Sequence, residues 1–233
     1  MNTSHSDPNT PVPRILVWDL PTRVFHWLLA ASFATAWLSA ESERWQLVHV
    51  TAGYTVAGLV VFRLLWGLVG TRHARFGDFV RGPGAVLAYL KSLVRGRPQH
   101  HAGHNPAGAL AILGLLALAA LTTASGWANY YEIGGDALEE VHEFLANAML
   151  ALVIVHVAAV VLSSLLHREN LVAAMIHGRK PVAPSEGIRT PWRSIGVLLL
   201  VAVLGFWWVQ WQSAPAGAPG TAPAATHGDK DED

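Results

Sequence analysis

Residues 141–166 read VHEFLANAMLALVIVHVAAVVLSSLL, and this stretch decides the fold class. Its only charged residue is Glu143, and it is long enough to cross the hydrocarbon core of a bilayer, which takes about 20 helical residues. It also carries His142 and His156. Ionisable side chains are costly in lipid and normally face the interior of a helical bundle. The stretch therefore predicts a membrane-spanning helix with a function inside the bundle.

Four further windows are long and apolar enough to span a membrane. They run from Leu16 or Leu20 to Ala40, from Leu47 to Gly70, from Ala107 to Trp127 and from Trp192 to Trp211. Charged residues make up 14% of the chain, whereas soluble domains carry about 25%. We therefore expect an all-α integral membrane protein, in which a four-helix transmembrane bundle is followed by a fifth, C-terminal transmembrane helix.

Composition also excludes several classes of function. The chain has no cysteine, which excludes disulfides, thiolate-bound iron–sulfur clusters, covalent c-type haem and a cysteine nucleophile. The formal net charge is zero, so no basic field supports nucleic-acid binding.

Basic residues are concentrated in two loops, 71–105 and 167–193, whereas the 41–46 turn has only Arg44 and the 128–140 loop has none. An excess of Lys and Arg marks the cytoplasmic side of a membrane protein. This bias predicts a multi-pass protein of the bacterial inner membrane, with a cytoplasmic N-terminus and a periplasmic C-terminus.

The chain divides into four segments by composition. We expect residues 1–13 to form a disordered tail without a cleaved signal peptide. We expect residues 14–181 to form the four-helix membrane domain. Residues 182–212 comprise a linker and the fifth helix, and residues 213–233 a disordered acidic tail. Within the first basic loop, the 75–95 stretch mixes apolar and basic residues and predicts a surface-lying amphipathic helix. Gly82-Pro83-Gly84 within this stretch is a loop breaker and not a nucleotide motif.

Four histidines in the apolar windows sort into two pairs by depth. His142 and His156 are 14 residues apart, so they share one face of a helix about 21 Å apart along its axis. His49 lies close to the outer end of its window, level with His142. His26 lies deep in its window, in the inner half with His156. A hydrogen bond between helices could explain any single histidine, but not the two level pairs.

Two imidazoles from different helices in an apolar bundle suit the axial ligation of haem b. A structural zinc ion fits less well, because it takes four ligands. Gly53, one turn after His49, leaves room for a flat ring, although helix packing explains it equally. Arg63 and Arg23 could pair with haem propionates or reach to the inner membrane interface. The loop histidines are expected to be solvated; they include His73, His100, His101 and His104.

Several motifs together resemble the prokaryotic cytochrome b561 family, which includes the b-type cytochrome subunits of nickel–iron hydrogenases. They are Arg23-Val-Phe-His26-Trp27, His49-Val-Thr-Ala-Gly53-Tyr54, Phe62-Arg63-Leu-Leu-Trp66-Gly67, Ala74-Arg75-Phe76, Gly103-His104-Asn105-Pro106-Ala107-Gly108-Ala109, Val141-His142-Glu143, Val155-His156 and the segment from Asn170 to Lys180. The resemblance covers about residues 14–181. It implies a four-helix bundle with two haem b groups, one held by His26 and His156 and the other by His49 and His142.

The resemblance also implies electron transfer between the membrane quinone pool and a partner redox protein, such as a c-type cytochrome or a hydrogenase. It leaves open whether the chain is itself a quinol oxidoreductase. A superoxide:quinone oxidoreductase on the same scaffold is an alternative, but it would require positive charge at the outer face. The outer segments are acidic instead, which suits a basic cytochrome c-like partner. A histidine-lined metal transporter is a third, weaker hypothesis.

Overall fold

A computed structural model describes residues 13–95 and 102–213 of the chain. The described part is helical apart from one small two-stranded sheet. The elements, in chain order, are β1 (Arg14–Leu16), α1 (Leu20–Ser39), η1 (Glu43–Trp45), α2 (Gln46–Val69), α3 (Phe76–Phe79), α4 (Pro83–Val94), α5 (Pro106–Tyr130), α6 (Asp136–His167), α7 (Leu171–His177), β2 (Arg179–Pro181), η2 (Pro184–Glu186) and α8 (Arg193–Gln212). The two predicted tails lie outside these ranges except for residues 13 and 213. The residues His5, His100, His101 and His227 also lie outside them.

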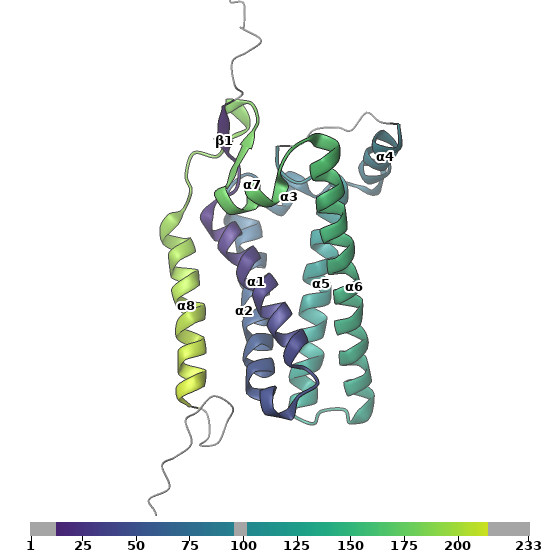
Figure 1. Cartoon of the computed structure of the whole chain (residues 1–233), viewed down its shortest axis with the longest axis vertical. Helices are drawn as coiled ribbons and strands as arrows, with labels where there is room; N and C mark the ends of the chain where they lie inside the picture. The colour runs from purple at the N-terminus through teal and green to yellow at the C-terminus, as the bar shows by residue number, and fades with distance from the viewer. Residues whose placement is uncertain (1–12, 96–101, 214–233) are drawn as a thin grey trace, which may run out of the picture.

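Helices α1, α2, α5 and α6 form an up-and-down bundle, and α8 lies along its outside against α1 (Figure 1). The closely packed pairs are α1 with α2, α5 with α6, α1 with α8 and α2 with α5. Helix α6 makes no comparable contact with α1 or α2. The bundle is therefore closely packed from α1 through α2 and α5 to α6, and it is more loosely packed between α6 and the pair of α1 and α2.

The five predicted windows all form helices, with ends within a few residues of those expected, except that α6 begins five residues earlier than predicted. Among the described helices, four are long and apolar enough to cross a membrane: α2 together with η1, α5, α6 and α8. Helix α1 is not among them, because Arg23 and His26 lower the mean hydropathy of its 20 residues. The chain is thus a multi-pass membrane protein, and the spanning of α1 stays a prediction.

Local chemistry fixes the starts of the helices. Asn105 caps α5, and its side-chain oxygen accepts a hydrogen bond from Gly108 N at 2.7 Å, while Pro106 occupies the first turn. Asp19 caps α1 in the same way through Thr22 N at 2.8 Å. A capping oxygen and an early proline satisfy or remove N–H groups that have no helical partner.

The core of the bundle is a cluster of buried apolar residues from four helices. It consists of Phe25, Val56, Leu59, Val60, Leu116, Ala119 and Met149. Met149 is the one buried residue of α6, so this helix touches the core mainly at mid-height. Most of the remaining α6 surface stays exposed within the chain.

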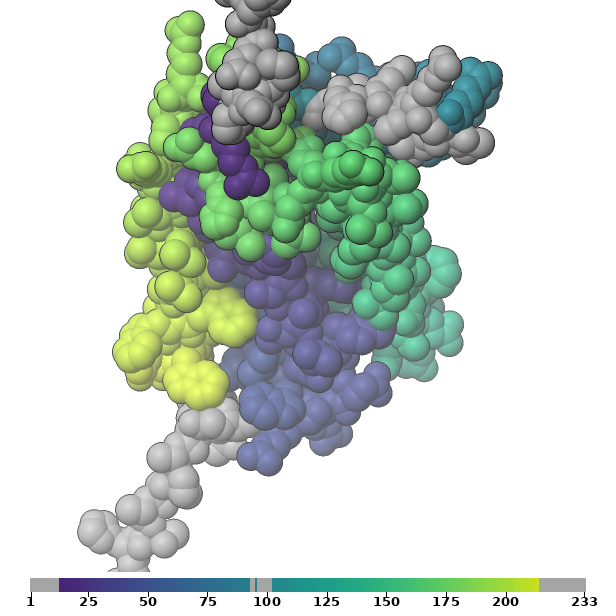
Figure 2. All heavy atoms as spheres, turned by 45° about the horizontal axis from the view of Figure 1, so that its top comes forward, coloured from purple at the N-terminus to yellow at the C-terminus, as the bar shows by residue number. Residues whose placement is uncertain are grey.

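One end of the molecule carries α3, α4, α7 and the sheet, and we call it the basic end because most of the Lys and Arg residues of the 71–95 and 167–193 segments lie there (Figure 1). We call the opposite end, formed by the short turns after α1 and α5, the acidic end because it carries Glu41, Glu43, Glu132 and Asp136. Strands β1 and β2 pair antiparallel, with Ile15 opposite Lys180. The segment around α7 and β2 lies over the start of α1, as the view toward this end shows (Figure 2). Gly178 allows this segment to lie close to the start of α1, because its φ is +78° and an added Cβ would lie 2.6 Å from the carbonyl oxygen of Trp18.

The prediction of one amphipathic helix over residues 75–95 is wrong in its extent. The stretch forms two helices, α3 and α4, separated by residues 80–82. Pro83 occupies the first position of α4, because a proline inside a continuous helix would remove a hydrogen bond and clash with the preceding turn. The surface-lying character of the stretch stays a prediction.

Candidate cofactor site

The two histidines at the acidic end face each other across the bundle. The ring centroids of His49 on α2 and His142 on α6 are 6.2 Å apart, and their planes cross at 81°. Metal–imidazole bonds of about 2.0–2.1 Å on both sides of one ion would hold two such centroids roughly 6 Å apart. The observed separation therefore fits one metal ion held between the two rings.

Backbone carbonyls orient both of these imidazoles. His49 Nδ1 lies 2.9 Å from the carbonyl oxygen of Ala36, and His142 Nδ1 lies 3.0 Å from that of Thr122. A carbonyl oxygen only accepts, so each Nδ1 carries the proton and each Nε2 keeps a free lone pair. A ligating histidine is normally oriented in this way by its second nitrogen. Ser125 Oγ adds a weaker contact to His142 Nδ1 at 3.3 Å.

Glycines shape the space around this pair. A Cβ added at Gly126 of α5 would lie 2.7 Å from Cε1 and 3.0 Å from Nδ1 of His142, so the ring occupies the place of a side chain. A Cβ at Gly53 would meet nothing within 4 Å. Gly126 therefore makes room for the imidazole, whereas Gly53 borders open space next to His49.

The second pair, His26 on α1 and His156 on α6, lies in the half of the bundle toward the basic end. The two side chains interact electrostatically. His26 Nδ1 is shielded from solvent and has no hydrogen-bond partner among the described residues. Helix α6 does not pack closely on α1, so the two imidazoles come from helices that are not in close contact. A flat macrocycle ligated from both sides needs two helices that are not in close contact.

The two arginines singled out from the sequence have different surroundings. Arg63 is 3% exposed, and its guanidinium carbon lies 4.7 Å from the centre of the Phe76 ring. Arg23 is half-buried and donates to the carbonyl oxygen of Ile176 at 2.5 Å, which ties α1 to α7. The described contacts of Arg23 are thus structural, and a role of either arginine at a cofactor stays a prediction.

A buried polar network at the basic end was missed by the sequence analysis. Asp19 is fully buried, and its Oδ2 accepts hydrogen bonds from Trp66 Nε1 at 3.2 Å and Thr71 Oγ1 at 2.5 Å. Lys180 is 4% exposed and forms an ion pair with Glu169 at 3.4 Å. The sequence offered one signal, since an aspartate two residues before a proline is a typical helix start.

His104 was expected to be solvated, and that expectation is wrong. Its ring lies between Trp18, at a centroid distance of 4.5 Å, and Phe79, at 4.6 Å. Removal from water, followed by the positive charge of Arg63, lowers the pKa of His104 to about 3. The imidazole is therefore neutral at physiological pH.

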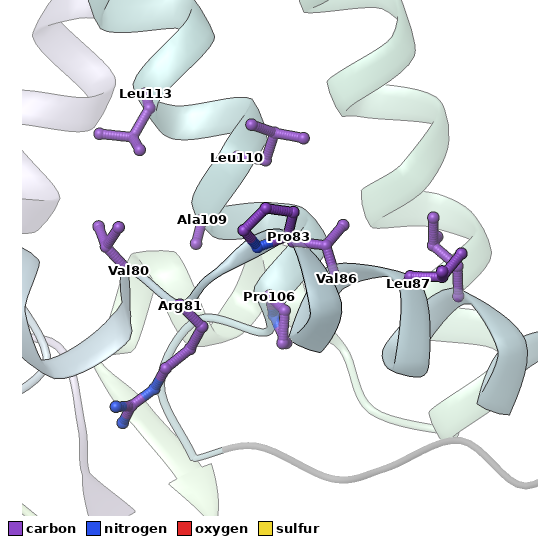
Figure 3. Close-up of a pocket in the computed structure, with 10 residues that line it drawn as sticks. Val80, Arg81, Pro83, Val86, Leu87, Pro106, Ala109, Leu110 and Leu113 are labelled. Carbon is purple, nitrogen blue, oxygen red and sulfur yellow. The ribbon is translucent and has the colours of Figure 1, made fainter.

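The described residues contain no group of three or more His, Asp or Glu side chains that could hold a metal ion. An apolar groove of about 320 Å³ lies elsewhere, between α4 and the start of α5 (Figure 3). Its lining comprises Val80, Arg81, Pro83, Val86, Leu87, Leu90, Pro106, Ala109, Leu110 and Leu113. None of the predicted site residues lines this groove, so the histidine pairs are the candidate site.

Comparison with known proteins finds similar proteins for most of the chain. The family model for prokaryotic cytochrome b561 matches residues 17–178. A probable Ni/Fe-hydrogenase B-type cytochrome subunit of Rhizobium leguminosarum bv. viciae is 24% identical, over 71% of this chain and 88% of that protein. Two proteins with the same description also match. The one from Bradyrhizobium diazoefficiens is 23% identical over 72% of this chain and 86% of that protein. The one from Azotobacter vinelandii is 24% identical over 70% of this chain and 87% of that protein. No solved structure matches the chain at a significant level.

Proposed function

The chain belongs to the prokaryotic cytochrome b561 family, and from that premise we propose that it is a dihaem b-type cytochrome that carries electrons across the membrane. One haem b is held by His49 and His142 near the acidic end, and the other by His26 and His156 in the half toward the basic end. Each iron, when bound, accepts and releases one electron. The task of the chain is to hold, orient and shield these two groups.

The geometry of His49 and His142 carries the proposal. The rings come from different helices, lie 6.2 Å apart between centroids, and have their Nδ1 atoms engaged by backbone carbonyls. Both Nε2 atoms are left as ligands, and the two backbone carbonyls hold the rings in their orientation. An imidazole pair with this spacing fits bis-histidine ligation better than a hydrogen bond between two helices.

The pair of His26 and His156 is supported by a different observation. His26 Nδ1 is buried without a partner in the described part of the chain. A buried polar atom without a partner costs about 1–3 kcal/mol, and this cost would be removed only by a bound group that reaches Nδ1 itself, as a metal ligated through Nδ1 would. Gly53, Arg63 and Arg23 belong to the same proposal as residues near the two macrocycles.

The acidic end suits a basic redox partner. Six acidic side chains are exposed there: Glu41, Glu43, Glu132, Asp136, Glu139 and Glu140. Charge of one sign around a redox site speeds the encounter with a partner of opposite charge. We assign to this end either a c-type cytochrome, which its acidic charge would suit, or a hydrogenase, as the names of the relatives suggest. We take the quinone pool as the other electron partner.

This assignment includes the membrane topology. All five long helices span the bacterial inner membrane, α1 included, because α1 runs beside α2 between the same two ends of the bundle (Figure 1). The basic end is cytoplasmic and the acidic end periplasmic, in accordance with the excess of Lys and Arg. The N-terminus is then cytoplasmic and the C-terminus periplasmic.

The test is a redox-titrated visible spectrum, with a haem-to-protein ratio, for the purified full-length chain and four single variants. We expect two b-type haems per chain. His49→Ala and His142→Ala should remove one spectral component, and His26→Ala and His156→Ala the other. His167→Ala is a matched control on α6, because His167 Nδ1 bonds the carbonyl of Ser163 at 3.0 Å, one turn back on the same helix.

Two outcomes would contradict the proposal. A wild-type chain with one haem or none would remove the dihaem cytochrome altogether. Loss of both components in each of the four histidine variants, with both retained in His167→Ala, would contradict the assignment of the two pairs to separate haems.

A further inference from the structure

Arg63 is a buried cation without a complete set of partners. It is 3% exposed on α2, and its Nη1 has no hydrogen-bond acceptor among the described residues. The rings of Phe76 and Phe79 lie 4.7 and 5.9 Å from its guanidinium carbon, but an aromatic face does not replace an acceptor for an N–H. A buried charge is tolerated when an anion pairs with it.

Asp19 does not supply that anion by direct bonding. It interacts electrostatically with Arg63, but its Oδ1 accepts from Thr22 N, and its Oδ2 from Trp66 Nε1 and Thr71 Oγ1. The carboxylate of Asp19 is thus committed to the helix cap and to the segment after α2. Arg63 Nη1 is left for another acceptor.

His104 offers a second donor at the same place. Its Nδ1 is shielded from solvent and also lacks a partner in the described part of the chain. Phe79 joins the two residues, since its ring lies 4.6 Å from the His104 ring and also within reach of Arg63. The electrostatic neighbours of His104 are Arg63, His73, Lys180 and His156, all of them cations or groups that become cations. The unsatisfied N–H of Arg63, together with that of His104 when its proton is on Nδ1, favours an anion in such surroundings.

The position of this site along the bundle relates it to the deeper histidine pair. His26 is six residues from the first residue of α1, and Arg63 is six residues from the last residue of α2. Both therefore lie about 9 Å inside the basic end of two antiparallel neighbours. His104 lies two residues before the start of α5, nearer that end, and it senses the charge of His156.

We propose that Arg63 and His104 together form a carboxylate-binding site, and that its ligand is a propionate of the haem held by His26 and His156. The inference rests on the proposed function and goes beyond it by adding His104 and by assigning both residues to one of the two haems. Arg63 supplies the charge, and the neutral imidazole of His104 donates one hydrogen bond from Nδ1. Phe79 and Trp18 keep water from the pair.

The test compares haem with its dimethyl ester, which lacks the carboxylates. The full-length chain is depleted of haem and refilled with either compound, and the transfer of each from the chain to excess apomyoglobin is timed. The component assigned to His26 and His156 is followed separately in the visible spectrum. We expect wild type to lose the ester from this site roughly tenfold to hundredfold faster than haem, as for a lost charge-assisted contact.

Variants connect that discrimination to the two residues. Arg63→Gln and His104→Leu should each lose haem faster from this site and discriminate less against the ester, whereas His104→Gln, which keeps a donor, should retain part of the discrimination. His73→Leu is the matched control, because His73 lies in the same cluster but its Nε2 already bonds the carbonyl of Glu186 at 2.6 Å. The component of His49 and His142 should not respond to any of these changes.

Equal retention of haem and ester at this site in wild type would overturn the inference, and so would full discrimination in both Arg63→Gln and His104→Leu. If a variant fails to fold, equal retention of haem and ester in wild type would still overturn the inference, and His104→Gln, which keeps a donor, still tests the part of His104. A chain that binds no haem at all would refute the proposed function, which is a different result from haem bound without discrimination.

Discussion

Substitution of Gly126 by alanine tests how tightly the His142 imidazole is positioned. The new Cβ would lie 2.7 Å from His142 Cε1 and 3.0 Å from Nδ1, whereas carbon atoms at favourable contact are about 3.5–4.0 Å apart. The ring must therefore retreat by roughly 0.8 Å. Its hydrogen bond to the Thr122 carbonyl, now 3.0 Å, would stretch or break.

Overpacking of this kind costs about 1–3 kcal/mol. A haem-free chain can relax by turning the His142 ring away, whereas haem binding requires the ring in place, so most of the cost falls on binding. The affinity for the haem at His49 and His142 should then fall roughly 5-fold to 150-fold. The haem at His26 and His156 should be retained as in wild type.

The assay is the rate of haem transfer to apomyoglobin, resolved into the two spectral components. Gly114→Ala is the matched control, because Gly114 is also on α5 and faces α6, but its Cβ would meet only the flexible end of Leu152 at 3.1 Å. Retention of the acidic-end haem in Gly126→Ala within twofold of wild type would refute the reasoning. Equal weakening of both haems would refute it as well.

Two further substitutions test the parts of the structure that hold the helices together. Asp19→Asn keeps an oxygen for the helix cap but removes the acceptor of two side-chain hydrogen bonds. We expect its free energy of unfolding in detergent to fall by about 1–3 kcal/mol, against about 0–1 kcal/mol for Asp78→Asn, which breaks a partly exposed ion pair with Arg75. Equal unfolding midpoints for the two variants would contradict this. Thr55→Val removes the hydroxyl that accepts a hydrogen bond from Trp207 Nε1 at 2.8 Å. The backbone amides of α8 should then exchange their hydrogens faster, while both haem components persist. Unchanged amide exchange in α8 would show that this bond does not hold the helix against the bundle.

The helices and the depths of the histidines could be predicted because both depend on local sequence. An apolar window defines a helix, and the depth of a residue in that helix is its count from the end multiplied by the rise per residue. The level of His49 with His142 follows from this count, and their ring separation of 6.2 Å agrees with it. The proline at position 83 was visible too, but the 75–95 stretch was still interpreted as one helix although Pro83 starts a second one.

The surroundings of His104 show where such reasoning stops. A histidine in a polar loop is solvated by default, and nothing near it in the sequence indicates Trp18 and Phe79, whose rings lie on either side of it. The same holds for Asp19, which bonds Thr71 across 52 residues. Contacts of this range depend on how helices and loops pack, which local patterns do not encode.

The sequence by itself determined a helical membrane protein, the heights at which its histidines lie and the opposite charge of its two ends, because hydropathy and helical rise are properties of consecutive residues. The tertiary structure decided which carbonyls orient His49 and His142, why Gly126 must lack a side chain, and that Arg63 and His104 meet at one aromatic ring. The reason is that the environment of a buried polar group is made by residues far away along the chain, and only the packing of the helices brings them together.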